Sequence, residues 1–229
     1  ALWRHLEMDI IVTDVTDMAV GHICVAGWSP EEGRMVRPLH SNGHPHWDAE
    51  LANCDLFSPG NVIAIQPSGQ NPNRGLPHCT EDALIVGEPS LSGKMNHDEM
   101  VKAVAGSVYG TVEEIFGAEF HDKHVPELTG LRSLGAVELP ASKPVRFYDD
   151  YDKLTCWFID KSDQKYSFPI SCRALKKVYE SEGLAGLDRL KQGARKLHLR
   201  IGLANPWGGP KGDWHPKRAY AMVNGIFFV

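Results

Sequence analysis

Short runs of apolar, β-favouring residues recur along this chain, and most of them are bounded by residues that favour turns. The runs cover residues 9–14, 22–27, 34–38, 61–66 and 83–86, and then residues 135–139, 144–148, 154–159, 165–170, 198–203 and 220–229. The 15 prolines and 22 glycines are spread along the chain, which suits many short strands better than a helical bundle. We therefore expect a β-rich protein with strands at the spacing of small barrels.

Two pairs of runs are separated by turn chemistry. Residues 29–33 (Ser-Pro-Glu-Glu-Gly) join the second run to the third, and residues 160–163 (Asp-Lys-Ser-Asp) join another pair in the second half. Such residues preset or tolerate turn dihedral angles, so both pairs are predicted to be β-hairpins.

Two segments change to a helical period. Residues 96–120 carry apolar side chains at three- and four-residue spacing, which predicts a helix and then a shorter one over residues 111–116. Residues 173–195 are also predicted to be helical, with breaks at Gly183 and Gly186.

The order strands, helix, strands, helix, strands predicts two similar units within an α+β, β-rich fold. We expect an N-terminal small barrel plus helices over residues 8–130. A C-terminal small barrel with a basic helix is expected over residues 131–229. Each unit has the length of a small domain with its own core.

The C-terminal third is the cationic part of an acidic protein. Residues 173–218 contain 11 lysines and arginines against 4 acids, a net charge of +7. Because the whole chain carries −5, the remainder carries −12. This asymmetry suggests a polyanionic partner, although a solvated helix face would look the same.

The cysteines argue for a reduced, cytoplasmic protein. They are five, an odd number, and widely spaced: Cys24, Cys54, Cys79, Cys156 and Cys172. A disulfide framework or a structural zinc site is not expected from this pattern.

No apolar run approaches the roughly 18 residues of a membrane helix, and no signal peptide is visible. Met8 is a candidate native start, with residues 1–7 added before it.

A histidine-rich loop over residues 39–48 suggests a metal site, and the pair His121 and His124 does so more weakly. The loop contains His40, His44 and His46, which Asp48 or His78 could join in space. Zinc sites normally use three or four ligands in a recognisable frame, and none is visible. We therefore predict a polar surface loop, with no metal and no cofactor.

Cys79, Glu81 and Asp82 form the best local candidate for catalysis. A cysteine nucleophile needs a base and an acid nearby. His78 is adjacent to Cys79, so on a strand the two side chains would point to opposite faces. A base would have to come from elsewhere, for example from His44 or Glu81. The alternative is a buried thiol followed by a turn.

Tryptophans and lysines gather in the loop before the last run. Residues 208–216 contain glycines without any phosphate-loop or dinucleotide pattern. Trp207, Lys211, Trp214 and Lys217 combine rings that can stack on bases with cations that can hold phosphate. The alternative is that the tryptophans fill the ends of a barrel.

Arg37 and Arg200 lie on predicted strands. An arginine there can fork onto a phosphate or a guanine edge. It can equally pair with an internal carboxylate, such as that of Asp14 or Glu81.

Several of these segments together resemble the dual OB-containing domain family. The segments are residues 22–27 (HICVAG), 34–38 (RMVRP), 77–82 (PHCTED), 200–207 (RIGLANPW) and 224–227 (NGIF). Asn205 departs from the pattern, in which an arginine is expected before the Pro-Trp pair. The resemblance covers nearly the whole chain from Met8. It implies two OB-like barrels in tandem, a bacterial source, and association with DNA-modification or phage-defence systems.

Three functions are compatible with these features. The first is a module that recognises DNA or RNA, single-stranded or modified, through Arg37, Arg200, Trp207, Lys211, Trp214 and Lys217. The second is an enzyme acting on a nucleobase or nucleotide through Cys79, with Glu81, Asp82 or a histidine of residues 40–46 in support. The third is an adaptor that docks on co-encoded proteins.

Overall fold

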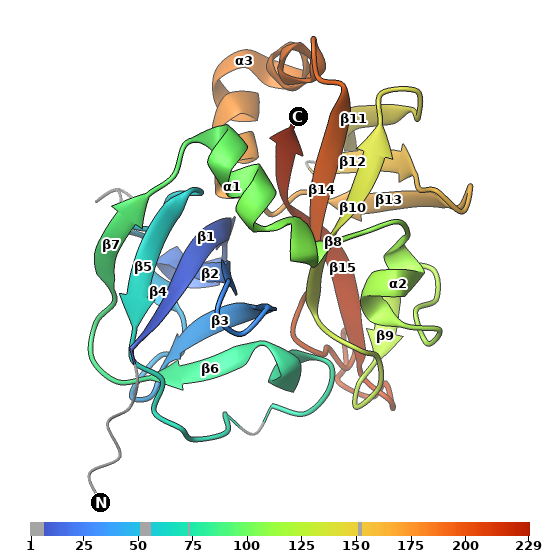
Figure 1. The fold of residues 1–229 in the computed structure, drawn as a ribbon. Coiled ribbons are helices and arrows are strands. Elements are labelled where there is room, and N and C mark those ends of the chain that lie inside the picture. The colour runs from blue at the N-terminus through green and yellow to red at the C-terminus, as the bar shows by residue number, and fades with distance from the viewer. Residues whose placement is uncertain (1–6, 51–55, 73, 151–152) are drawn as a thin grey trace, which may run out of the picture. The chain divides into compact units, whose positions relative to one another are not determined.

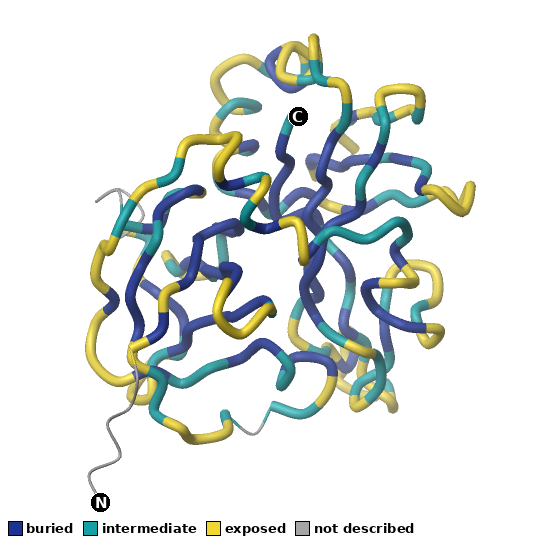
Figure 2. Tube along the Cα trace, in the orientation of Figure 1, coloured by how far each residue is buried: buried dark blue, intermediate teal, exposed yellow. Residues whose placement is uncertain are grey.

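The computed structural model describes residues 7–50, 56–72, 74–150 and 153–229 (Figure 1). They form two compact units. The first holds the described residues up to Arg74 together with Glu81–Ser107, and the second holds Gly75–Thr80 and Val108–Val229. Each unit buries its own hydrophobic core (Figure 2). The domain boundary proposed from the sequence, between residues 130 and 131, stays a prediction.

The first unit is a barrel of strands β1 (Met8–Asp17), β2 (His22–Ser29), β3 (Arg34–His40), β5 (Asn61–Ile65) and β6 (Asp82–Ile85). β1 pairs antiparallel with both β2 and β5, β2 pairs with β3, and β3 runs parallel to β6. A bridge between Pro67 and Ile85 joins the end of β5 to β6 and closes the ring. Two short strands flank it, β4 (Trp47–Asp48) beside β2 and β7 (Ser90–Lys94) beside β5.

β1 is the strand that bends to close this barrel. Its pairing with β2 shifts register between Val12 and Asp14, which marks a β-bulge. Bulges increase strand twist and let a strand curl. The backbones are close beside the bulge, because a Cβ at Gly27 would lie 2.5 Å from the Ile11 carbonyl oxygen. Any larger residue at position 27 would push the two strands apart.

The second unit repeats this strand order. β10 (Leu134–Pro140) turns into β11 (Val145–Asp150), followed by β12 (Lys153–Ile159), β13 (Lys165–Pro169), β14 (Lys196–Leu203) and β15 (Arg218–Phe228). β11, β12 and β13 pair in sequence, and β14 lies between β10 and β15. A parallel bridge from Ile170 to Val223 joins the end of β13 to β15. If β10 and β11 are counted as one bent strand, both units have five strands in the same arrangement. In each unit the third strand meets the fifth in parallel, and the fourth strand lies beside the first.

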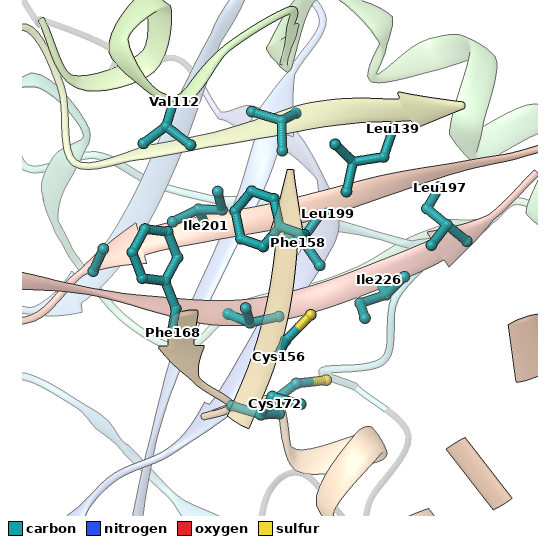
Figure 3. Close-up of a cluster of buried hydrophobic side chains, with 14 of the residues drawn as sticks. Val112, Leu139, Cys156, Phe158, Phe168, Cys172, Leu197, Leu199, Ile201 and Ile226 are labelled. Atoms are coloured by element: carbon teal, nitrogen blue, oxygen red, sulfur yellow. The ribbon is translucent and has the colours of Figure 1, made fainter. Parts of the chain in front are cut away.

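The core of the second barrel is aromatic. Phe158 and Phe168 of the β12–β13 hairpin point toward Leu199 and Ile201 of β14 (Figure 3). The two phenyl rings meet edge to face with their centroids 5.6 Å apart, a favourable geometry for aromatic pairs.

Short helices connect the barrel strands. α1 (His97–Ala103) starts at a capping box, in which Asn96 and Glu99 each bind the other's backbone N–H at 3.0 and 2.9 Å. α2 (Val112–Phe116) starts at Thr111, which accepts from the Glu114 N–H. The predicted helical stretch is interrupted between them by β8 (Val108–Tyr109), which pairs with β10.

α3 (Arg173–Lys191) lies between β13 and β14, near one end of the second barrel (Figure 1). Its backbone leaves the helical conformation at Gly183, at φ 64°, where a break was predicted. Among the described residues, no helix is both long and apolar enough to cross a membrane.

The predicted fold class is confirmed: the chain is β-rich, with OB-like barrels and a few helices. Both predicted hairpins form, β2–β3 and β12–β13. Sequence reasoning missed the short strands β4, β7, β8 and β9 (His124–Pro126). With two to five residues each, they are too short to show a period.

Candidate nucleic-acid interface

The loop between β14 and β15, residues 204–217, gathers most of the residues predicted to bind nucleic acid. Trp207 and Arg218 close its base, because each backbone N–H donates to the other's carbonyl at 2.9 and 3.0 Å. The segment 210–217 beyond this pair is largely exposed (Figure 2). In Figure 1 the loop lies at the end of the barrel away from α3. OB barrels use this fourth-to-fifth-strand loop for oligonucleotide binding.

Glycines let the loop fold onto Trp214. The Trp214 N–H donates to the Gly208 carbonyl at 2.8 Å. Gly209 has φ +87°, and a Cβ there would lie 2.6 Å from the indole of Trp214. The indole of Trp214 therefore packs directly on the Gly209 backbone. The backbone conformation of Gly209 is one that residues with a side chain rarely adopt.

Trp207 offers the free aromatic surface of the loop. Its ring meets that of Trp214 edge to face with centroids 5.3 Å apart, and Tyr220 lies 6.4 Å away. The Arg218 guanidinium lies over the Trp214 ring, 4.4 Å from its centroid. Gly209 and Arg218 thus pack against the Trp214 ring, whereas Trp207 is 49% exposed to solvent.

The cations of the C-terminal region are not equally available. Lys196 pairs with Glu138, Arg189 with Glu182, and Lys191 with Asp188, at 2.8, 2.7 and 2.7 Å respectively. By contrast, Lys211 and Lys217 of the loop are exposed. Three of the 11 cations of residues 173–218 are therefore held in ion pairs, and the loop lysines are among the cations left to meet a polyanion.

An open pocket of about 390 Å³ lies beside Trp214. Its lining residues come from β9, from the loop and from the start of β15: His124, Pro126, Asp213, Trp214, His215, Pro216 and Arg218. Burial lowers the pKa of His124, and the nearby Arg218 charge lowers it further. His124 is therefore mostly neutral at pH 7.

The chain matches the dual OB-containing domain family over residues 8–226. The protein belongs to this family. No curated protein matches it. A dual OB domain suggests a fold of the nucleic-acid-binding type. The rings and cations that the β14–β15 loop presents agree with such a fold.

A second aromatic and cationic surface of this dual OB protein lies on β11 and β12. Arg146 and Trp157 are cross-strand neighbours, and the guanidinium lies 5.5 Å from the centroid of the ring. Ser167 of β13 continues the same row. Sequence reasoning missed this surface, because neither residue stands in a local cluster of similar side chains.

Arg37 and Arg200, both predicted to contact nucleic acid, are buried inside the protein. Arg37 is the register partner of Asp82 across β3 and β6, and its guanidinium forms an ion pair with the Asp82 carboxylate. Burial alone would lower the pKa of Arg37, but the Asp82 charge raises it above the ordinary value. Arg200 lies within the second unit, over the ring of Phe227. The alternative of an internal carboxylate is met for Arg37 by Asp82.

The three candidate catalytic residues have different surroundings. Cys79 is a half-buried free thiol in one turn of 3-10 helix, His78–Thr80. Asp82 is buried and pairs with Arg74 at 3.1 Å as well as with Arg37. The Glu81 carbonyl accepts from the Arg37 N–H at 2.8 Å. Both oxygens of the Asp82 carboxylate are engaged by guanidiniums, one by Arg37 and the other by Arg74, and this arrangement favours a structural role for Asp82.

His78 is committed to a structural contact within the second unit. Its Nε2 lies 3.0 Å from the Leu203 carbonyl oxygen, so this nitrogen carries the proton and donates.

The catalytic role of Cys79 stays a prediction that thiol chemistry can test. Cys54 lies outside the described residues.

Cys79 is expected to react with iodoacetamide only at the rate of an ordinary, partly shielded thiol. Burial raises the pKa of Cys156 to about 12, and Cys172 is buried, so neither should compete. Mass spectrometry of peptides after timed labelling at pH 7 measures the rate, with Cys79→Ser as the control. Alkylation many times faster than that of free cysteine would instead favour the enzyme hypothesis.

The histidine loop is held by ring contacts. The His22 and His44 rings stack with centroids 3.7 Å apart, and the His46 N–H donates to His44 Nδ1 at 3.2 Å. Burial and the charges of Arg74 and Arg37 lower the pKa of His46 to about 4, which leaves His46 neutral. Among the residues that the structure describes, no three His, Cys, Asp or Glu side chains are grouped to hold a metal ion.

Proposed function

We propose that this dual OB-containing protein binds single-stranded nucleic acid through the β14–β15 loop of its second barrel. The observation that carries the proposal is the half-exposed Trp207 in the same loop as the exposed lysines Lys211 and Lys217. A base can stack on the open indole while the lysines meet the flanking phosphates. Arg37 and Arg200 are left out of this surface because both are buried.

A single strand suits this surface better than a duplex. Unpaired bases expose the faces on which Trp207 can stack, whereas a duplex hides them. The row of Arg146 and Trp157 gives the same chemistry on the β11–β12 face, which is part of the usual OB binding surface. Recognition of modified DNA in a bacterial modification or phage-defence system, and a cytoplasmic location, are the finer parts of the proposal.

Replacing Trp207 with alanine is expected to weaken binding of a labelled single-stranded oligonucleotide by about tenfold, since stacking contributes about 1–3 kcal/mol per base. Fluorescence anisotropy measures it on DNA and RNA, single- and double-stranded. Leu128→Ala is the matched control, because Leu128 is 71% exposed in the same unit but has no ring. Equal losses in both variants, or no binding to any probe, would remove the proposal.

The salt dependence of binding measures the contribution of the cations separately from that of base stacking. If Lys211 and Lys217 each meet a phosphate of a single strand, affinity falls about sevenfold between about 50 and about 200 mM salt. Lys211→Ala should flatten this slope, while Lys102→Ala on α1 in the first unit should not. An adaptor role stays the alternative, and co-migration with co-encoded proteins on size exclusion would support it.

A further inference from the structure

Arg218 is held in place by backbone pairing and by an aromatic ring. Its backbone is fixed on both sides, paired with Trp207 and with Pro126 of β9. The guanidinium lies on the Trp214 ring, and among the described residues no carboxylate lies within ion-pair distance of it. Guanidinium has five N–H donors. Arg218 therefore presents fixed, unused donors to the pocket that it lines.

Asp213 supplies the opposite chemistry in the same pocket. It is exposed, and within the described part of the chain no cation pairs with it. Although Asp213 and Arg218 line one cavity, they lie too far apart to form an ion pair. The pocket thus carries a carboxylate and a guanidinium that do not pair with each other.

The walls favour a flat ligand that carries no charge. Trp214, Pro126 and Pro216 give the pocket apolar surfaces between its polar groups. Because His124 is mostly neutral at pH 7, it adds little charge to that of Asp213 and Arg218, which balance. A phosphate would meet the Asp213 carboxylate unfavourably. At about 390 Å³, the cavity is at the small end of ligand pockets.

We propose that this pocket takes one unpaired guanine base from the bound strand. Arg218 would donate to guanine O6 and N7, a pairing that arginine makes commonly. Asp213 would accept from the adjacent N1–H and N2–H donors. Of the four common DNA bases, guanine carries two neighbouring acceptors on one edge and two neighbouring donors on the next. This inference rests on the proposed function, since it names the base preferred by the same surface.

The test uses oligothymidylate with a single central substitution, measured by anisotropy at fixed salt. We expect wild-type protein to bind the guanine-containing strand about tenfold more tightly than strands with adenine, cytosine or thymine at that place. Inosine, which lacks the 2-amino group, and 7-deazaguanine, which lacks N7, should each lose part of this preference.

Asp213→Asn should abolish the difference between guanine and inosine, because it changes the contact to the base edge and not the stacking of Trp207. Asp122→Asn is the matched control. Asp122 is also an exposed acid of this unit, outside the pocket, and its φ of 53° suits asparagine.

Free guanosine monophosphate separates this inference from the proposed function. Quenching of tryptophan fluorescence by guanosine monophosphate, stronger than by adenosine monophosphate and lost in Asp213→Asn, supports the pocket even if no oligonucleotide binds. Oligonucleotide binding with no preference for guanine in either assay overturns the inference and leaves the proposed function standing.

Discussion

Replacing Asp82 with asparagine is expected to lower the free energy of unfolding of the first unit by about 3–5 kcal/mol, the range found when one partner of a buried ion pair is removed. Asp82 is fully buried and receives both Arg37 and Arg74. Asparagine keeps the shape and removes the charge, so Arg37 stays buried without its counterion. Arginine does not lose its proton in proteins, so deprotonation of Arg37 cannot relieve the cost.

Urea denaturation measures this loss. Glu32→Gln is the control, because Glu32 pairs with Arg34 on the surface, where an ion pair contributes about 0–1 kcal/mol. Oligonucleotide affinity should be unchanged in Asp82→Asn below its melting temperature, since the proposed surface lies in the second unit. A stable Asp82→Asn protein that has lost an enzymatic activity would contradict this account and favour the catalytic role.

Arg37 shows where prediction from the sequence stopped. Its strand and the preceding turn were predicted correctly, since both depend on neighbouring residues. Its partner Asp82 lies 45 residues further along the chain, and the two meet because β3 and β6 run in parallel. Parallel strands are not joined by a short turn, so no local sequence signal indicates that they pair. The sequence therefore placed the arginine on a strand and left its partner open.

The candidate site divides in the same way. Trp207, Lys211, Trp214 and Lys217 were found from the sequence because one loop contains them all. His124 was not singled out for this site, because it reaches Tyr220 and the pocket only through the pairing of β9 with β15. Local composition revealed the cations and rings, whereas the pocket between them depends on contacts between distant segments.

Replacing Phe158 with alanine is expected to destabilise the second unit by about 3–5 kcal/mol, the usual cost of truncating a buried phenylalanine. Phe158 is fully buried, meets Phe168 edge to face, and contacts the aromatic core near Leu199 (Figure 3). Close packing leaves nothing nearby to fill the space of the missing ring. Val145→Ala, a partly buried position at the edge of the same core, should cost clearly less.

The Asp82 and Phe158 variants together test the predicted division into two domains. If each unit folds around its own core, Asp82→Asn should speed amide exchange in the first barrel, and Phe158→Ala in the second. Hydrogen exchange with mass spectrometry assigns each change to a segment. Faster exchange in both units from either variant would show that they unfold as one, and the division at residues 130 and 131 would then be wrong. Confined effects would leave the second barrel, with Trp207 and the pocket beside Trp214, as an independently stable binding unit.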